Sequence, residues 1–212
     1  MLELYAIPVS LYCAKTRILL RFKGLQWTEI PPPGGYGSDE YKTVVPSGNL
    51  PALRDGDLLI ADSEAIAEYL DDRYPEPAAL PAEPCARAVV RERSRFHDTR
   101  LEPALRTLFP YLPGRGTAPD GFLASGTARL NLLLDQLAQL LQPAPGAGGT
   151  LTLAECGYPV TFSWMDAMAP RMGLEIEWPD TVLRYRARLQ ECPQIVAELA
   201  DYTPKLTRFL DG

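Results

Sequence analysis

An acid and a hydroxyl, Asp62 and Ser63, stand at the start of a segment with helical spacing. Apolar residues follow at 65, 66, 69, 70 and 74, and this spacing predicts an amphipathic helix. The opposite, solvated face is expected to carry Glu64, Glu68, Asp71 and Asp72. The first turn of a helix leaves backbone N–H groups free to hold an anion. The pair is therefore either an ordinary helix cap or part of an anion-binding site.

Ser10 and Cys13 stand at the start of another predicted helix, from about 12 to 23. Ser10 alone would be read as the cap of that helix. A cysteine in a first helical turn can have a lowered pKa and become a reactive thiolate. The offset of three residues places both side chains along one face of that helix.

The segments around these residues alternate between strands and helices. Short strands are predicted at 2–7 and 26–30, before and after the helix that follows Ser10. Residues 31–38, rich in proline and glycine, form a predicted surface loop. A hairpin then joins 52–54 to 58–60 through a tight turn, and the helix of Asp62 follows. Pro51 opens the first hairpin strand, where its missing N–H limits pairing.

The second part of the chain has a different sequence pattern, in which helical spacing replaces the alternation of strands and helices. Four prolines between residues 75 and 84 forbid a helix, so 76–84 is predicted as a linker between domains at 1–75 and 85–212. Helices are predicted at 89–108 and 122–141, from a capping box at 152–155 to about 169, and from 178 to a break at 192–193. The glycine-rich stretch 143–149 lacks the Lys-Ser/Thr of a phosphate-binding loop.

The chain resembles the glutathione transferase superfamily. The resemblance rests on L-P-A-L at 50–53, the turn, the apolar strand, and D-S-x-A-I-x-x-Y-L at 62–70. The capping box and the closing segment 178–195 are also similar to that family, so the resemblance covers essentially the whole chain. It implies an α/β thioredoxin-like domain followed by an all-helical bundle, with a cis bond before Pro51.

The resemblance also implies a role for Ser10. Counting back from Thr16-Arg17-Ile18 puts Ser10 where theta- and zeta-like transferases carry their first active-site serine, whereas omega-like members carry a cysteine there. A serine favours transferase or isomerase chemistry over thiol exchange. Its hydroxyl would stabilise the thiolate of glutathione, which acts as co-substrate. Cys13 remains the rival, because it could form a mixed disulfide with glutathione.

Other site residues follow from the resemblance by position. Leu50, beside Pro51, is expected to offer its backbone to the cysteinyl part of glutathione, and Asp62 and Ser63 to take the γ-glutamyl end. Asn49 stands near them, at a place where many members have lysine. A second-substrate pocket is expected to be apolar, although each candidate is as easily a core residue: Leu11, Tyr12, Phe109, Tyr111 and Tyr158.

Composition bounds the partners. The chain has 212 residues and a net charge of −6, which disfavours nucleic acid and anionic membranes as partners. No apolar run is long enough to span a bilayer, and no signal peptide is recognised at the start. The four cysteines match no metal-binding or redox-pair spacing, so no metal site is expected. Free thiols favour a reducing cytoplasm.

The predicted function is a glutathione transferase of detoxification type, in which activated glutathione attacks an electrophilic, apolar small molecule. The resemblance implies a two-fold homodimer. Two alternatives stay open. One is a non-catalytic interaction protein that keeps the fold, and the other is a glutathione-dependent thiol-exchange reductase that uses Cys13.

Overall fold

The computed structural model describes residues 1–141 and 151–212. The glycine-rich stretch 143–149, predicted not to bind phosphate, lies outside these residues. None of the helices described is both long enough and apolar enough to cross a lipid bilayer.

The four predicted strands form one mixed sheet. In chain order they are β1 (Leu2–Tyr5), β2 (Trp27–Ile30), β3 (Ala52–Asp55) and β4 (Leu58–Ala61), and their order in the sheet is β2-β1-β3-β4. β1 runs parallel to β2 and antiparallel to β3, which forms a hairpin with β4. The hairpin turn places Gly56 at a φ of +60°, a backbone conformation that glycine adopts without steric cost.

Three helices accompany the sheet, namely α1 (Leu11–Phe22), α2 (Asp39–Val44) and α3 (Ser63–Arg73). Two of them are the helices predicted from spacing, and α1 buries the middle of its apolar run completely. The sequence pattern assigned no element to α2, because six residues are too few to show a period. Its signal is the cap, since the Ser38 hydroxyl accepts a hydrogen bond from the Tyr41 N–H at 3.0 Å.

The described residues after α3 form helices and turns. The predicted helix 89–108 is interrupted by a π-helical turn, and a 3₁₀ turn opens the segment that begins at the capping box, where Thr152 N–H donates to Glu155. The main helices are α4 (Pro84–Phe96), α5 (Glu102–Arg106), α6 (Phe122–Leu140), α7 (Tyr158–Met172), α8 (Asp180–Leu189) and α9 (Pro193–Asp211).

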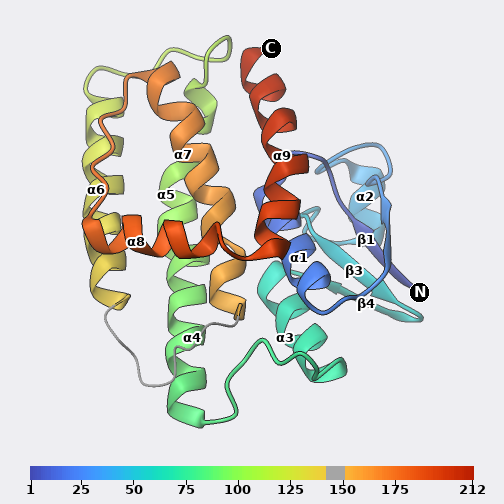
Figure 1. Cartoon of the computed structure of the whole chain (residues 1–212). Helices are drawn as coiled ribbons and strands as arrows, with labels where there is room; N and C mark the ends of the chain where they lie inside the picture. Colours follow the sequence, from blue (N-terminus) through green and yellow to red (C-terminus); the bar gives the residue numbers. More distant parts are fainter. Residues whose placement is uncertain (142–150) are drawn as a thin grey trace.

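Figure 1 shows the two parts side by side, with the sheet and its helices on one side and the bundle on the other. α9 stands between them and packs against both α1 and α7. The fold is therefore a thioredoxin-like domain followed by a helical domain, as predicted. The bounds at 75 and 85 stay predictions; α3 ends at Arg73 and α4 begins at Pro84.

The predicted solvated face of α3 is wrong at Glu64 and Asp71, which are both buried. Each carboxylate meets a buried lysine from the α1 segment, because a charge leaves water only when it is paired. Lys15 Nζ lies 2.7 Å from Glu64 Oε2, and Lys23 Nζ lies 2.7 Å from Asp71 Oδ1. Lys15 also pairs with Asp98 of the helical domain at 2.6 Å, which ties the two domains together.

Candidate active site

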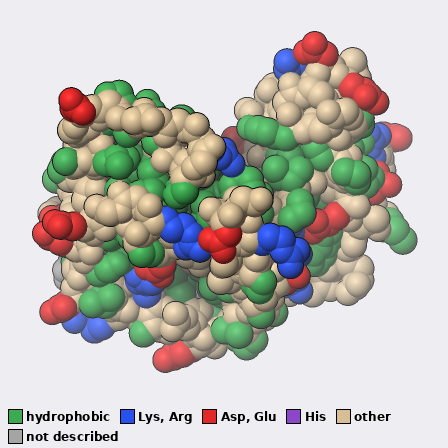
Figure 2. Space-filling view, turned by 90° about the horizontal axis from the view of Figure 1, so that it is seen from above, with side chains coloured by type: hydrophobic (Ala, Val, Ile, Leu, Met, Phe, Trp, Pro, Cys, Tyr) green, Lys and Arg blue, Asp and Glu red, His purple; other side chains and the backbone are tan. Residues whose placement is uncertain are grey.

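A cleft of about 1030 Å³ separates the start of α1 and the start of α3 from the helical domain. Figure 2 shows the molecule hollowed between two lobes, with hydrophobic side chains along the walls of the hollow. One wall carries backbone and polar groups of the thioredoxin-like domain, and the other carries aromatic and arginine side chains. Concave sites with this mixture are typical of small-molecule binding.

Ser10 lies at the edge of this cleft and is the N-cap of α1. Its Oγ accepts a hydrogen bond from the Cys13 N–H at 3.3 Å. The cap uses the oxygen as an acceptor, so the hydroxyl hydrogen stays available to donate to a ligand. Because α1 is a helix of 12 residues, its positive end also favours an anion at this point. The cap interpretation and the thiolate interpretation are thus compatible.

The structure contradicts the prediction that Cys13 contacts glutathione. The side chain is completely buried, and its Sγ faces the Tyr5 carbonyl oxygen at 4.0 Å in the interior of the domain. Burial raises the pKa of the Cys13 thiol above its ordinary value, although Ser10 and Arg17 act in the opposite direction. A buried thiol of raised pKa is a poor nucleophile. Although Cys13 follows Ser10 by three residues, its side chain lies in the core and does not line the cleft.

The loop before β3 presents backbone groups to the cleft. The peptide bond between Leu50 and Pro51 is cis, as the resemblance implied. Among the residues the structure describes, neither the N–H nor the C=O of Leu50 has a hydrogen-bond partner. Two bonds hold the preceding residue, since Tyr41 donates its hydroxyl to the Asn49 carbonyl at 3.1 Å and the Asn49 N–H donates to Ser47 Oγ at 3.2 Å. The unpaired groups of Leu50 suit an extended peptide ligand.

Asp62 and Ser63 line the same cleft. Asp62 has a φ of +86°, and a side chain at positive φ is strained, which often marks a functional position. Its Oδ1 accepts hydrogen bonds from the N–H groups of Glu64 at 2.9 Å and Ala65 at 3.1 Å. The predicted anion site is therefore smaller than expected. Within the described part of the chain, only the Ser63 N–H of this first turn is left without an acceptor.

Aromatic rings form the apolar wall. Phe109 stacks on Trp164 with ring centroids 4.5 Å apart, and Phe209 meets Trp164 edge-on at 5.9 Å. All three line the cleft, together with the predicted Leu11 and Tyr12. This wall suits an apolar or unsaturated ligand.

Two of the predicted pocket residues lie elsewhere. Tyr158 is fully buried, and its hydroxyl donates to the Arg93 carbonyl at 2.7 Å inside the bundle. Tyr111 does not line the cleft and packs on Phe122 with centroids 4.8 Å apart. Both predictions are wrong for the same reason. A tyrosine ring has enough apolar area to serve the core, and the sequence does not show which wall it joins.

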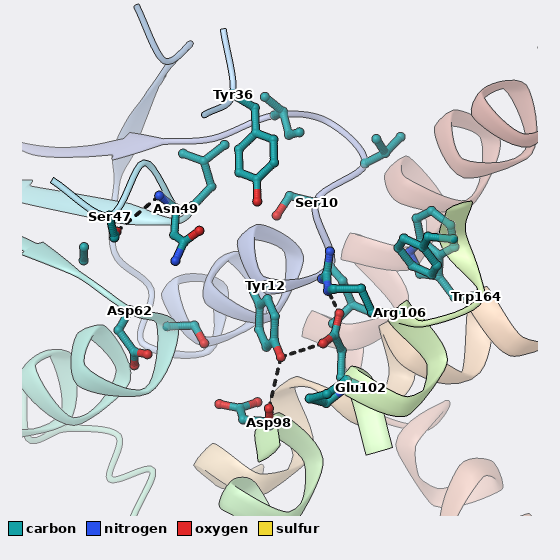
Figure 3. A pocket seen from close by; sticks show the side chains of 18 of the residues that line it. Ser10, Tyr12, Tyr36, Ser47, Asn49, Asp62, Asp98, Glu102, Arg106 and Trp164 are labelled. Atoms are coloured by element: carbon teal, nitrogen blue, oxygen red, sulfur yellow. Dashed lines mark hydrogen bonds and ion pairs between the residues drawn. The ribbon is translucent and has the colours of Figure 1, made fainter. Parts of the chain in front are cut away.

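Tyr36, Glu102 and Arg106 line the cleft but were not predicted there, and two of them are linked to the predicted Tyr12. Tyr12 donates its hydroxyl to Glu102 Oε2 at 2.8 Å, and Glu102 also pairs with Arg106. Burial, with a further contribution from Glu102, raises the pKa of the Tyr12 phenol and keeps it protonated. Figure 3 shows the Tyr36 hydroxyl directed toward Ser10 and the same open space. These side chains come from a loop and a distant helix, so no local motif connects them.

Two arginine side chains of the helical domain lie against the aromatic rings of the cleft. The Arg106 guanidinium lies over the Tyr12 and Phe109 rings at 5.6 and 5.3 Å, and the Arg115 guanidinium lies over Phe209 at 4.8 Å. Both arginines line the cleft. A guanidinium can bind a carboxylate through two parallel hydrogen bonds.

The two domains and the cleft between them define the class of the fold, a thioredoxin-like domain followed by a helical domain. Residues 4–78 match the family model described as glutathione S-transferase, N-terminal domain. A delta-class glutathione transferase of Nilaparvata lugens superimposes with a TM-score of 0.81 at 21% identity, covering 100% of this chain and 99% of that one. Residues 4–78 are thus similar to the N-terminal domain of glutathione S-transferases, and the solved structure shares the fold of the whole chain.

Curated relatives match over part of their length. Glutathione S-transferase Z2 of Arabidopsis thaliana is 37% identical over 56% of this chain and 55% of its own. Maleylacetoacetate isomerase of Pseudomonas aeruginosa is 39% identical over 43% of this chain and 45% of its own. A stringent starvation protein A homolog of Coxiella burnetii is 33% identical over 47% of this chain and 51% of its own. The chain thus spans about half the length of the curated relatives it matches.

Proposed function

We propose that this protein is a glutathione-dependent transferase in which Ser10 activates the thiol. The observation that carries the proposal is the Ser10 hydroxyl, which lies in the cleft at the positive end of α1 with its hydrogen free to donate. The thiol of glutathione loses its proton to solvent, and Ser10 Oγ–H donates to the resulting thiolate. The thiolate then forms a C–S bond to an electrophilic carbon as that carbon's bond to a leaving group breaks.

The interactions available at Ser10 are strong enough to ionise the glutathione thiol at neutral pH. A thiol pKa of about 8.5 must fall by about two units for the thiolate to dominate at neutral pH, which requires about 2.7 kcal/mol. A hydrogen bond to a charged sulfur supplies roughly 1.5–3 kcal/mol. The positive end of the helix adds about 0.3–2 kcal/mol. No separate general base is needed.

The remaining groups of the polar wall bind the tripeptide. The backbone N–H and C=O of Leu50, beside Pro51, pair with the cysteinyl residue. Ser63 N–H and its hydroxyl take the γ-glutamyl carboxylate, and Asp62 takes the ammonium group. Asp62 Oδ1 is occupied by the helix cap, so this contact belongs to Oδ2.

A second candidate reaction is cis–trans isomerisation of a carboxylate-bearing substrate. The observation that favours it is the Arg115 guanidinium over Phe209 of the aromatic wall, which suits a planar, unsaturated acid, whereas Arg106 is already paired with Glu102. The thiolate would add to the double bond, the new single bond would rotate, and elimination would return glutathione and the trans product. One relative is named maleylacetoacetate isomerase, which agrees with this chemistry.

A third candidate is a non-catalytic interaction protein. The match to a stringent starvation protein A homolog keeps this alternative in view. Glutathione affinity separates the two classes, because a protein without glutathione chemistry has no need of the arrangement of Ser10, Leu50, Asp62 and Ser63 around one cleft.

The test is a panel of reactions with glutathione, namely aryl halide conjugation, peroxide reduction, disulfide exchange and isomerisation of a maleyl compound. We expect the wild type to conjugate or isomerise, and Ser10→Ala to lose about 10- to 100-fold in kcat/KM, the value of a charged hydrogen bond. Ser163→Ala is the matched control, since its hydroxyl bonds the Pro159 carbonyl outside the cleft. No activity in any assay and no glutathione binding by calorimetry would refute the proposal and favour the interaction protein.

We further propose a two-fold homodimer in the cytoplasm, with the face that carries Asp62 toward the partner's helices. The fold supports the first part, and the four cysteines, none of them in a disulfide, agree with the second. Light scattering that gives a monomer at micromolar concentration would contradict the dimer.

A further inference from the structure

The peptide that carries Ser10 is held from a helix almost 200 residues away in the chain. The Tyr202 hydroxyl of α9 donates to the Val9 carbonyl oxygen at 2.8 Å, across a separation of 193 residues. Val9 and Ser10 both line the cleft, whereas Tyr202 is only 1% exposed. This bond therefore acts on the backbone next to the proposed thiol-activating group without touching a ligand.

The direction of this bond is fixed by a third residue. Trp164 Nε1 lies 2.7 Å from the Tyr202 hydroxyl oxygen. An indole nitrogen can only donate, so the Tyr202 oxygen must accept and its hydrogen must go to Val9. Burial raises the pKa of the Tyr202 phenol above its ordinary value, so the hydrogen is present at physiological pH. Trp164 and Tyr202 are thus two successive donors, and the chain ends at the carbonyl oxygen of the Val9–Ser10 peptide, which accepts.

The rest of the loop is held as well. Arg17 donates from Nη2 to the Ile7 carbonyl at 3.3 Å, and the Ser10 N–H donates to the same carbonyl at 3.3 Å. Arg17 also faces Glu198 of α9 at 3.6 Å. The loop is thus braced from α1 and α9 together, and the Tyr202 bond is the contact by which α9 holds the Val9–Ser10 peptide.

We propose that Tyr202, held by Trp164, is a positioning residue that sets the location of the Ser10 hydroxyl in the cleft. The inference rests on the proposed role of Ser10. It adds that the helical domain contributes to thiol activation, and not only to binding the electrophile. Trp164 has both functions, since it stacks on Phe109 in the aromatic wall and donates to Tyr202 behind that wall. Figure 3 shows Trp164 across the cleft from the polar groups around Ser10.

Tyr202→Phe tests the idea, because it keeps the ring and removes only the hydroxyl. The matched control is Tyr185→Phe, another buried tyrosine of the helical domain, whose hydroxyl meets Glu155 Oε1 at 3.4 Å and not the cleft. There are two readouts. The first is the pKa of the bound glutathione thiol, measured from the thiolate absorbance as a function of pH. The second is the pair of kinetic constants, kcat and the KM for glutathione, determined separately.

With Tyr202→Phe, we expect the pKa of the bound thiol to rise toward that of free glutathione and kcat to fall by about tenfold at neutral pH, one decade for each decade of thiolate lost. The KM for glutathione should stay within about twofold, because the groups that bind the tripeptide are unchanged. Tyr185→Phe should change neither quantity. An unaltered thiol pKa in Tyr202→Phe, or the same loss in both variants, would overturn the proposal.

A second measurement does not depend on catalysis. Amide hydrogen exchange over residues 8–12 of the ligand-free protein should be faster in Tyr202→Phe than in the wild type, and unchanged in Tyr185→Phe. Equal exchange in all three proteins would refute the positioning role. A wild type that does not lower the pKa of bound glutathione would instead refute the role of Ser10, whatever the exchange shows.

Discussion

Asp62 has two separable functions in this structure, and substitutions can distinguish them. Its Oδ1 caps α3 through the N–H groups of Glu64 and Ala65, and its negative charge is proposed to hold the ammonium group of glutathione. Asp62→Asn keeps the size and a carbonyl oxygen for the cap but removes the charge. Asp62→Ala removes both, and Asp62→Gly removes both while relieving the strain of a side chain at φ +86°.

The expected stabilities and affinities differ in order. Loss of the cap in Asp62→Ala costs about 1 kcal/mol of unfolding free energy. Asp62→Asn costs less than about 1 kcal/mol, the interaction of a charge with the helix end. Glycine costs only a few tenths as a cap, and strain relief of about 1–3 kcal/mol should offset that. Glutathione affinity should nevertheless fall in all three, by about 10- to 100-fold, because each lacks the carboxylate.

The assays are thermal or urea denaturation for stability, calorimetry for glutathione affinity, and steady-state kinetics. The γ-glutamyl end lies far from the sulfur and binds the ground and transition states alike, so KM should rise with kcat nearly unchanged. Glu83→Ala is the control, since Glu83 caps α4 through the N–H groups of Cys85 and Ala86 and does not line the cleft. Wild-type affinity in Asp62→Asn, or affinities that follow stability through the series, would refute the reasoning and leave Asp62 as a helix cap.

Three further predictions concern buried groups. Cys13→Ser should leave the pKa of bound glutathione unchanged, because the thiol is buried away from the cleft; a raised pKa would return Cys13 to the site. Lys15→Met should cost about 3–5 kcal/mol in urea denaturation, since two buried carboxylates lose their partner, whereas Lys205→Met, from an exposed pair, should cost less than about 1 kcal/mol. Burial opposes the ionisation of Asp98, but the His97 hydrogen bond and the Lys15 charge outweigh it and hold its pKa at about 2, below the ordinary 3.8. The ionised Asp98 therefore contributes about 2 kcal/mol to the free energy of unfolding. This stabilisation is present above about pH 4 and is lost as the pH falls toward 2. Asp98→Asn should therefore flatten the acid limb of stability against pH, and an unchanged acid limb would show that Asp98 does not contribute.

Most elements of the fold could be predicted because the sequence signals that specify each of them lie within a short segment. The strands of the hairpin, the turn at Gly56 and the cap at Asp62 lie within one short segment, so their chemistry is adjacent in sequence. The polar wall of the cleft comes largely from the same segment, and the resemblance to glutathione transferases is what placed Leu50, Asp62 and Ser63 around one expected site. Their roles stay predictions until glutathione binding is measured.

The other wall could not be predicted in the same way. Arg106, Arg115 and Tyr36 come together only through the packing of one domain on the other, and no spacing connects them. Glu64 was misplaced for a related reason. The helical spacing of the apolar residues puts Glu64 on the polar face of α3. A lysine from another helix, Lys15, nevertheless neutralises its charge and makes its burial possible.

The position of α9 has a consequence for how the chain is made. Its Tyr202 reaches back across 193 residues to Val9, a span that a ribosome extends in about 10–40 s at roughly 5–20 residues per second. The thioredoxin-like domain therefore leaves the ribosome well before the helix that completes it. During that interval the face of α1 that α9 later covers is open, with Arg17 lacking Glu198. The nascent first domain therefore exposes this face until α9 has been synthesised and docks, and the bond that holds the Val9–Ser10 peptide forms only then.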